Sequence, residues 1–451
     1  MKKDLIMQSL LNNRSSESSI TVDVCVLGAG PVAAVAVLQA RQQGLRVIQI
    51  APKLNVSNML FAVPRLYAVT PAVQQSLSKL GVWGLINTLS THSCTDMQVF
   101  WQLSAKALYA RPNSYPIHLS ANTAKIPELC SFVTEEVLQT ALNTALLVTQ
   151  GQSPANLFYD TQVLNYKPQL QAHTDGINIR LNNQAFVMAQ LCIVAEGANS
   201  SSAAQMDRSP TVFDYKHHAV VAELHAQVEP HLIPKVINTA WQWLGDELNN
   251  DVLALLPMGQ LVGHKNKLRY SLVWSQPSAS ASDYTNNSDA LLIALQKRIA
   301  NNAPELFSAG ALSLHGGTQQ FPLFASRTPY YTAPRTVLVG DAAHKIHPLA
   351  GQGLNLGFED VFALFDIVSQ RESWRSLGDE RILSRYQRRR SAQISPIDKL
   401  IHTIATRHTL LPPVKAIVQL GLQLQTDIPV IGTWLRRCVV RRMATIPSII
   451  R

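Results

Sequence analysis

The chain has 451 residues and a low charge content: 47% of its residues are hydrophobic and only 15% are charged, against a usual charged share of about 25%. This composition excludes an intrinsically disordered or fibrous protein, and the length allows up to about three domains with a sizeable core. The longest uninterrupted apolar run, Val32 to Leu38, is far shorter than the roughly 20 residues of a transmembrane helix, so we expect no membrane span.

The N-terminal residues and the cysteines give no sign of export or of a disulfide or zinc framework. Residues 1–20 start with two lysines but lack a sustained apolar stretch and a cleavage-site pattern, which predicts a polar disordered tail rather than a signal peptide. The five cysteines form no C-x-x-C pair, which suits a reducing compartment, so we predict a cytoplasmic protein. These cysteines are Cys25, Cys94, Cys130, Cys192 and Cys438.

The net charge of +10 is concentrated at the C-terminal end. Residues 371–451 hold 15 Lys+Arg and 5 Asp+Glu, so the rest of the chain is neutral. A basic segment of this kind either contacts nucleic acid, an anionic membrane surface or an acidic partner, or forms a solvated helical face. These alternatives are open at this point.

The first predicted elements form a βαβ unit. A buried strand at 23–27 is followed by a glycine turn, a helix to about Gln43 and a second strand at 46–50. A helix at 134–147 and a strand at 185–195 come next.

The pattern then changes and later returns. Short alternating strands between 210 and 275 indicate an antiparallel sheet, hence a second domain inserted into the first, and the polar run 276–289 is expected to be a surface loop. A strand at 335–340 leads through a glycine-rich turn into a helix from about Leu354, and the chain is predicted helical after Leu383.

The motif Gly28-Ala-Gly30-Pro-Val-Ala33 lies between the first strand and its helix. The first glycine allows a tight turn, the second lets the backbone approach a pyrophosphate, and the small Ala33 permits close helix–strand packing. The phosphate would lie at the helix N-terminus. This motif in this context predicts dinucleotide binding.

A second glycine-rich motif, GDAAHKIHPLAGQGLNLG, spans residues 340–357. Asp341 ends a strand, where a carboxylate can bond a ribose or ribitol hydroxyl. Residues 351–355 offer backbone amides at a helix N-terminus, which suit a phosphate or an electron-rich ring. His344 and His347 precede a turn without further ligands nearby, so no metal site is predicted. Trp241 and Trp243 are expected to be core or pocket wall.

With these motifs, the chain from about Val22 to Leu435 resembles the FAD-dependent aromatic monooxygenases that hydroxylate polyprenylated phenols in ubiquinone biosynthesis, the UbiH/UbiF/VisC group. Shorter matches are RLYAVT at 65–70, LGVW at 80–83, the helix start at 132–142, ALLP at 254–257 and SLVWS at 271–275.

The resemblance and the element pattern together predict an α/β fold. A Rossmann-like FAD-binding domain of the aromatic-hydroxylase type would comprise 21–100, 121–205 and 330–395, an interleaved antiparallel-sheet substrate domain 101–120 and 206–329, and a basic helical segment 396–451. The predicted FAD-binding residues come from the two glycine-rich motifs and from two family matches between them. These are Gly28, Gly30, Ala33, Arg65, Gln139, Gly340, Asp341, Pro348, Gly351, Gln352, Gly353, Leu354 and Asn355.

Four positions depart from the family pattern, and the first of them is Val63, which stands where the family's D-x-R element has its aspartate. The second strand ends at Ala51 rather than at the acidic residue that binds the ribose hydroxyls. In the family's A-D-G-x-x-S-x-x-R element, Glu196 replaces the aspartate and Ala203 the arginine. These changes bear on nucleotide affinity and on the route of reduction, not on the ring-binding loop.

The implied activity is hydroxylation of a polyprenylated phenol by a reduced flavin that captures O₂ as a peroxide in a dry, apolar cavity. No catalytic side chain is assigned.

The alternatives are a related flavin hydroxylase of another aromatic substrate and a degenerate scaffold in a ubiquinone-biosynthesis assembly. The electron donor is either NAD(P)H or a separate reductase. Expected partners are the lipid phenol, O₂, ubiquinone-biosynthesis proteins and, through the basic end, the inner-membrane surface, with no nucleic acid.

Overall fold

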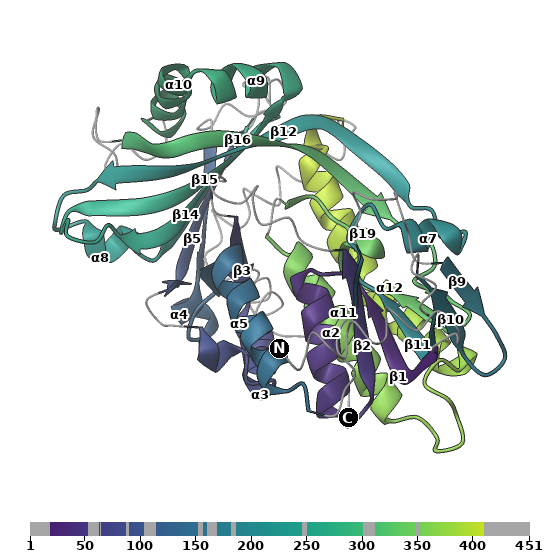
Figure 1. The fold of residues 1–451 in the computed structure, drawn as a ribbon. Helices are drawn as coiled ribbons and strands as arrows, with labels where there is room; N and C mark the ends of the chain where they lie inside the picture. Colours follow the sequence, from purple (N-terminus) through teal and green to yellow (C-terminus); the bar gives the residue numbers. More distant parts are fainter. Residues whose placement is uncertain are drawn as a thin grey trace.

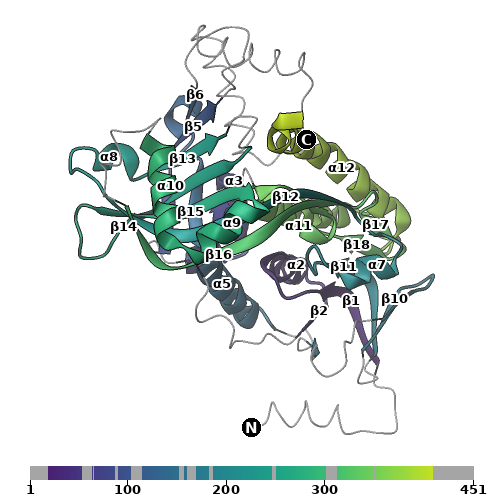
Figure 2. The ribbon, with the colours of Figure 1, turned by 90° about the horizontal axis from the view of Figure 1, so that it is seen from above.

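The computed structural model describes residues 19–52, 63, 65–86, 90–102, 114–151, 157–159, 169–181, 186–245, 250–300, 312–348 and 351–409. Most of the predicted N-terminal tail and residues 410–451 lie outside this description. Among the described helices, none combines the length and the apolar character needed to cross a bilayer. Two large sheets lie at opposite sides of the molecule (Figures 1 and 2).

The first large sheet has the strand order β17-β18-β11-β1-β2-β8, with β10 and β9 attached to β11. Its central strands pair in parallel and are buried because helices cover the sheet. Its strands are β1 (Ser19–Leu27), β2 (Val47–Pro52), β8 (Leu157–Tyr159), β9 (Gln169–Ala172), β10 (Ile177–Arg180), β11 (Phe186–Val194), β17 (Thr332–Ala333) and β18 (Thr336–Leu338).

Four long helices accompany this sheet, and α2 packs against both α5 and α11. Proline at the first position of α2 and Thr134 as N-cap of α5 are typical helix starts. The four helices are α2 (Pro31–Gln42), α5 (Glu135–Val148), α11 (Gly353–Ser369) and α12 (Glu380–Ala405).

The second large sheet is mostly antiparallel, in the order β19-β16-β12-β15-β14-β13-β5-β6. Its outer face packs under α9 (Ser278–Asn286) and α10 (Ser288–Ala300), and Trp243, fully buried, lies in this core. Its strands are β5 (Asp96–Gln102), β6 (Ser114–Ser120), β12 (Thr211–Gln227), β13 (Thr239–Leu244), β14 (Val252–Gln260), β15 (Lys267–Pro277), β16 (Leu312–Arg327) and β19 (His344–Lys345).

A small sheet of β3 (Leu66–Val69), β7 (Cys130–Thr134) and β4 (Thr91–Cys94) connects the two large sheets. Phe132 of this sheet packs with Ala240 and Leu256 on the inner face of the antiparallel sheet, the face opposite α9 and α10. The remaining short elements are α3 (Pro71–Lys79), η2 (Trp83–Leu85), α4 (Ala121–Ala124), α7 (Ser201–Gln205), α8 (Ile233–Val236), η4 (Gly340–Ala342) and η6 (Arg407–Thr409).

The predicted fold class is confirmed, and so is the core location of the two tryptophans. The loop expected at 276–289 is wrong, because most of it is α9. Ala281 is buried there, Tyr284 stacks on Trp274 at 5.4 Å, and Ser282 bonds the carbonyl of Ser278, so a polar sequence still forms a helix with one packed face.

The predicted domain boundaries stay a prediction, and two of them fall inside elements. Residue 100 lies within β5, which belongs wholly to the antiparallel sheet, and residue 396 lies within α12. The proline at 396 removes one backbone donor, and α12 continues past it to Ala405.

The glycine at 357 is required by helix packing. A Cβ there would lie 2.8 Å from Val32 Cγ2 of α2 and 3.2 Å from the Cα of Gly340. We expect Gly357→Ala to lower the free energy of unfolding by about 1–3 kcal/mol, because α11 must move away from α2. The measurement is the urea midpoint of unfolding. Gly317→Ala is the matched control, because a Cβ at Gly317 meets no atom within 4 Å. Equal losses in both variants would contradict this packing argument.

Candidate functional site: a flavin site at the end of the parallel sheet

The turn after β1 has the geometry of a nucleotide-binding turn. Gly28 has φ +128°, and a Cβ there would lie 2.3 Å from the carbonyl oxygen of Ala195, so only glycine fits. The side chain of Gln49 donates a 2.8 Å hydrogen bond to the carbonyl of Gly28. Gly30 is the N-cap of α2, a Cβ there would meet no protein atom within 4 Å, and Ala33 is buried against the sheet.

Asp341 follows β18 and lies half-buried in η4. Burial raises the pKa of its carboxyl, although the charges of His344, Lys345 and Arg65 act in the opposite direction. No described residue donates a hydrogen bond to this carboxylate, so it is available to a ligand hydroxyl. Asp341 and Arg65, predicted from separate motifs, therefore lie near enough to interact electrostatically.

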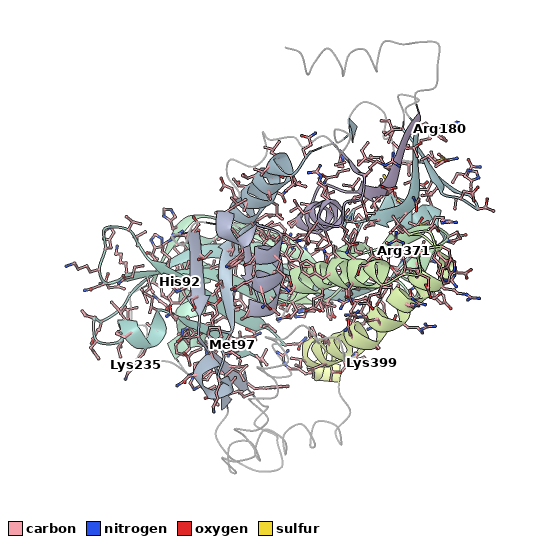
Figure 3. The ribbon with its side chains drawn as sticks, turned by 90° about the horizontal axis from the view of Figure 1, so that it is seen from below. His92, Met97, Arg180, Lys235, Arg371 and Lys399 are labelled. Atoms are coloured by element: carbon pink, nitrogen blue, oxygen red, sulfur yellow. The ribbon has the colours of Figure 1, made fainter. Side chains whose placement is uncertain are left out.

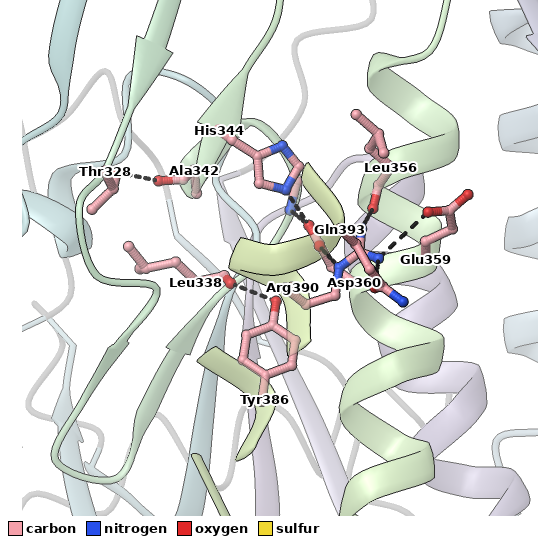
Figure 4. Close-up of polar contacts among 11 residues, drawn as sticks. Thr328, Leu338, Ala342, His344, Leu356, Glu359, Asp360, Tyr386, Arg390 and Gln393 are labelled. Carbon is pink, nitrogen blue, oxygen red and sulfur yellow. Dashed lines mark hydrogen bonds and ion pairs between the residues drawn. The ribbon is translucent and has the colours of Figure 1, made fainter. Parts of the chain in front are cut away.

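Asp360 of α11 is fully buried and joins the segments around the site (Figure 4). Its carboxylate accepts hydrogen bonds from the Gly340 amide at 2.8 Å, from His344 Nε2 at 2.7 Å and from Arg390 Nε at 2.6 Å. Burial alone would raise the pKa of Asp360, but the charges of His344 and Arg390 hold it below its usual value. Arg390 also donates to the carbonyl of Leu356 at 3.1 Å.

The start of α11 is tied to β3. Asn355 Nδ2 donates to the carbonyl of Ala68 at 2.7 Å, and its Oδ1 accepts from the amide of Thr70 at 3.1 Å. Gly351, with φ +60°, brings the preceding turn against Ala68, since a Cβ there would lie 3.4 Å from that of Ala68. The Asn355 amide therefore positions the turn that was predicted to face the flavin ring. Gln352, Gly353 and Leu354 form the N-cap and first turn of α11.

The three other predicted FAD-binding residues are Arg65, Gln139 and Pro348. Arg65 is exposed, with its guanidinium 5.4 Å from the ring centre of Tyr67. Gln139 lies in α5, and its amide donates to Asn143 one turn further on, at 3.0 Å. Pro348 is exposed at the end of a described stretch, because residues 349 and 350 lie outside the description.

Three of the four residues that differ from the family pattern either hold a turn by hydrogen bonds or pack in the core. Glu196 Oε2 accepts from Ser200 Oγ at 2.8 Å and from the Ser202 amide at 3.1 Å, so this carboxylate holds the turn before α7. Ala203 and Ala51 are buried, at 2% and 0% exposed, and take part in packing. The lost ribose and pyrophosphate contacts are thus not replaced at these positions by charged side chains.

Sequence reasoning missed Asp360 and Arg390. Arg390 lies in a run of arginines that reads as a solvated face, yet it is 1% exposed. The two histidines of the second motif have different partners: His344 bonds Asp360, whereas His347 packs edge-on to Tyr215 at 4.6 Å. Within the described residues, no group of three or more His, Cys, Asp and Glu side chains is arranged to hold a metal.

The residues present fit FAD. Neither α2 nor α11 has a side-chain N-cap hydrogen bond, so the first-turn amides of both helices are available to anionic or electron-rich ligand groups. The glycine turn at Gly28 lets the backbone come close to a pyrophosphate, and Asp341 offers an acceptor to a ribitol hydroxyl.

Comparisons with known proteins agree with this geometry. The FAD binding domain family model matches residues 21–397. The chain is 28% identical over 376 residues to the 3-demethoxyubiquinol 3-hydroxylase of Escherichia coli (strain K12), covering 82% of this chain and 85% of that one. It is 25% identical over 394 residues to the mitochondrial ubiquinone biosynthesis monooxygenase COQ6 of Xenopus tropicalis, covering 80% and 79% of the two chains. The solved structure of P. aeruginosa PqsL in complex with 2-aminobenzoylacetate matches with a TM-score of 0.64 at 19% identity, covering 86% of this chain and 96% of that chain.

The chain therefore belongs to the FAD binding domain family, in the class of FAD-dependent aromatic monooxygenases. Within that class, its similarity extends over most of the chain to hydroxylases named for ubiquinone biosynthesis, as the sequence motifs predicted. The individual FAD contacts assigned above remain predictions.

We expect Asp360→Asn to lower the free energy of unfolding by about 1.5–3 kcal/mol, because the buried Arg390 guanidinium loses its nearer carboxylate and keeps only the longer 3.4 Å contact with Glu359. The same variant should bind FAD more weakly, since the Gly340 amide loses its anchor. Chemical unfolding and FAD fluorescence titration measure the two effects. Asp366→Asn is the matched control on the same helix: its partner Arg389 is partly exposed, so its cost should stay below about 1 kcal/mol. Similar costs in both variants would refute the central role of Asp360.

The Asp341→Asn variant distinguishes an effect on FAD affinity from an effect on the stability of the protein. FAD affinity should fall about 10–100-fold, because a charged hydrogen-bond acceptor is lost. Burial raises the pKa of Asp341, so its ionised form costs stability at every pH above that raised value. Removing the charge should therefore leave the FAD-free protein equally or more heat-stable at pH 7. Unchanged FAD affinity would show that Asp341 does not contact the cofactor.

Proposed function

We propose that this protein hydroxylates the aromatic ring of a polyprenylated phenol in ubiquinone biosynthesis. The observation that carries the proposal is an apolar centre on the inner face of the antiparallel sheet. Val221 of β12, Val273 of β15 and Ala254 of β14 are cross-strand neighbours on this face and are half-buried. The named activities of the ubiquinone-biosynthesis relatives support the same substrate class.

This apolar centre is enclosed by packed side chains at two ends. Toward the small sheet, Ala240 and Leu256 pack with Phe132. Toward α12, Leu244 and Val252 form a second cluster with Ile404. The half-buried centre between them suits an aromatic ring and a hydrocarbon tail, since each buried CH₂ contributes about 0.8 kcal/mol to binding.

FAD, when bound and reduced, supplies the activation of O₂ that this chemistry needs. The residues of the chain then have three tasks: the glycine turn and Asp341 bind the cofactor, Asn355 and Asp360 orient the loop that faces the ring, and the apolar inner face orients the phenol and excludes water. We propose that NAD(P)H or a separate reductase provides the electrons.

We further propose a peripheral contact of the basic C-terminal segment with the inner-membrane surface or with ubiquinone-biosynthesis proteins. Part of its charge is paired inside the molecule: Arg385 bonds Glu372 at 2.9 Å and Arg389 bonds Asp366 at 2.6 Å. Lys399 projects from the C-terminal half of α12 (Figure 3). The predicted docking residues are Arg385, Arg388, Arg389 and Arg390 in α12, and Arg436, Arg437, Arg441 and Arg442, which lie outside the described residues. Arg390 is 1% exposed, so its prediction as a docking residue is wrong.

The direct test incubates FAD-loaded protein with a polyprenylated phenol, O₂ and, in turn, NADH, NADPH or a flavin reductase with NADH. We expect a product heavier by one oxygen atom, found by mass spectrometry. Oxygen transfer to an unrelated phenol but never to the polyprenylated one would overturn the proposal and favour a flavin hydroxylase of another aromatic substrate.

Val273→Asp should weaken binding of the prenylated phenol at least tenfold, because a carboxylate replaces an apolar contact at the centre of the inner face. Binding is measured by the change in flavin absorbance on titration. Val262→Asp is the control for the added charge, because Val262 is 92% exposed. A Val273→Asp protein that binds the phenol as tightly as the control would exclude this face as the substrate wall.

A further inference from the structure

A small cavity lies where the antiparallel sheet, the loop after η4 and the end of α12 meet. Its volume is about 10 Å³, which is close to the space of one water molecule. We call it the junction cavity. Its lining residues are Tyr215, His217, Asn250, Val252, Ser275, His347 and Ala405.

Two buried acceptors belong to the lining. His217 Nδ1 lies 2.8 Å from the carbonyl oxygen of Tyr215, which can only accept, so Nδ1 carries the proton and Nε2 of the neutral ring is an acceptor. Asn250 Nδ2 donates to the carbonyl of Ala405 at 3.4 Å, which leaves Oδ1 as the second acceptor. Both His217 Nε2 and Asn250 Oδ1 are buried and bond no described residue. Such a pair calls for a ligand that donates two hydrogen bonds.

His347 also lines the cavity. Burial, and then Arg407 together with His217 and His402 when these are protonated, lowers its pKa to about 3. Its imidazole therefore stays neutral and supports the cavity by edge-on packing against Tyr215. Among the lining imidazoles, His217 is the one with an accepting nitrogen that bonds no described residue.

The junction cavity continues the inner face of the sheet. Val252 and Ser275 are cross-strand partners, and Ser275 pairs with Ala219 of β12. On this face of β12, Ala219 alone separates His217 from Val221, the half-buried residue of the apolar centre. A phenol lying over that centre can thus direct its hydroxyl toward the cavity.

We propose that the junction cavity binds one water molecule, which donates to His217 Nε2 and to Asn250 Oδ1, and that His217 accepts the phenolic proton through this water. The second part rests on the proposed function. The phenol O–H bond breaks and its proton passes to the water, while a water proton passes to Nε2. Phenolate and imidazolium result, and no electrons are exchanged. The titratable or charged described groups around this site include Tyr215, His347, His402, Arg407 and Arg327, and Arg327 is paired with Asp398.

The water is tested by a high-resolution crystal structure of the FAD-loaded protein. We expect density for one water within hydrogen-bond distance of both His217 Nε2 and Asn250 Oδ1. A dry cavity, or a water that bonds only one of the two atoms, would overturn this part whatever the substrate is.

The proton transfer is tested with 4-nitrophenol, whose anion absorbs at longer wavelength than the neutral phenol, titrated into the oxidised FAD-loaded protein across a pH range. His217→Asn keeps a side-chain donor near the carbonyl of Tyr215 but removes Nε2. We expect the ionised fraction of bound phenol, below its own pKa, to fall about tenfold in this variant. His218→Asn is the control, because His218 bonds Ser278 and does not line the cavity.

Equal ionised fractions in His217→Asn, His218→Asn and the unmodified protein would refute the role of His217. A protein that binds no phenol, with or without a prenyl tail, would contradict the proposed function and the proton transfer together. The crystallographic result on the water would then still decide the first part on its own.

Discussion

The flavin site depends on one buried carboxylate. Asp360 lies in α11 and bonds η4 through the Gly340 amide, β19 through His344 and α12 through Arg390. From the same helix, Asn355 bonds the backbone on both sides of the end of β3. Segments that are far apart in the sequence therefore meet at fixed distances around the place where a flavin ring would lie. Loss of the carboxylate would remove the bonds to η4, β19 and α12 at once.

A buried ion pair is not by itself stabilising, because the desolvation of two charges offsets much of their attraction. Here the cost is reduced by additional hydrogen bonds: Arg390 also donates to the carbonyl of Leu356 and to Gln393 Oε1 at 2.6 Å. Glu359 adds a second carboxylate, and its pKa is raised by burial. The effect is on geometry, because Asp360 and Arg390 are each bonded to several partners at once and hold those partners in one arrangement.

Sequence patterns predicted those parts of the fold that depend on residues close together in the chain. The glycine turn at Gly28 and the buried strands follow from backbone conformation and apolar runs, and the structure has them where they were expected. The Asp360–Arg390 pair could not be predicted in this way, because the residues are 30 positions apart and each looks like an ordinary polar helix residue. The helix α9 was missed for a similar reason, since its packed face is defined by Trp274 on another strand. Asn355 was predicted to bind FAD, and that role stays a prediction; the bond of its amide to β3 is shown only by the tertiary structure.

The long strands β12 and β16 pair antiparallel from Thr211 and Arg327 to Ala226 and Leu312, and they arch across the molecule from the parallel sheet to the far side of the antiparallel one (Figure 1). At about 3.3 Å per residue, the 17 residues of β12 span on the order of 55 Å. The two halves of the enzyme are thus joined by paired strands, whose ladder is interrupted by register shifts at Asp214–His217 and Val221–Glu223. A hinge-like opening between the halves would have to break the paired stretches of that ladder, so we expect a substrate to enter and leave by rearrangement of loops and side chains.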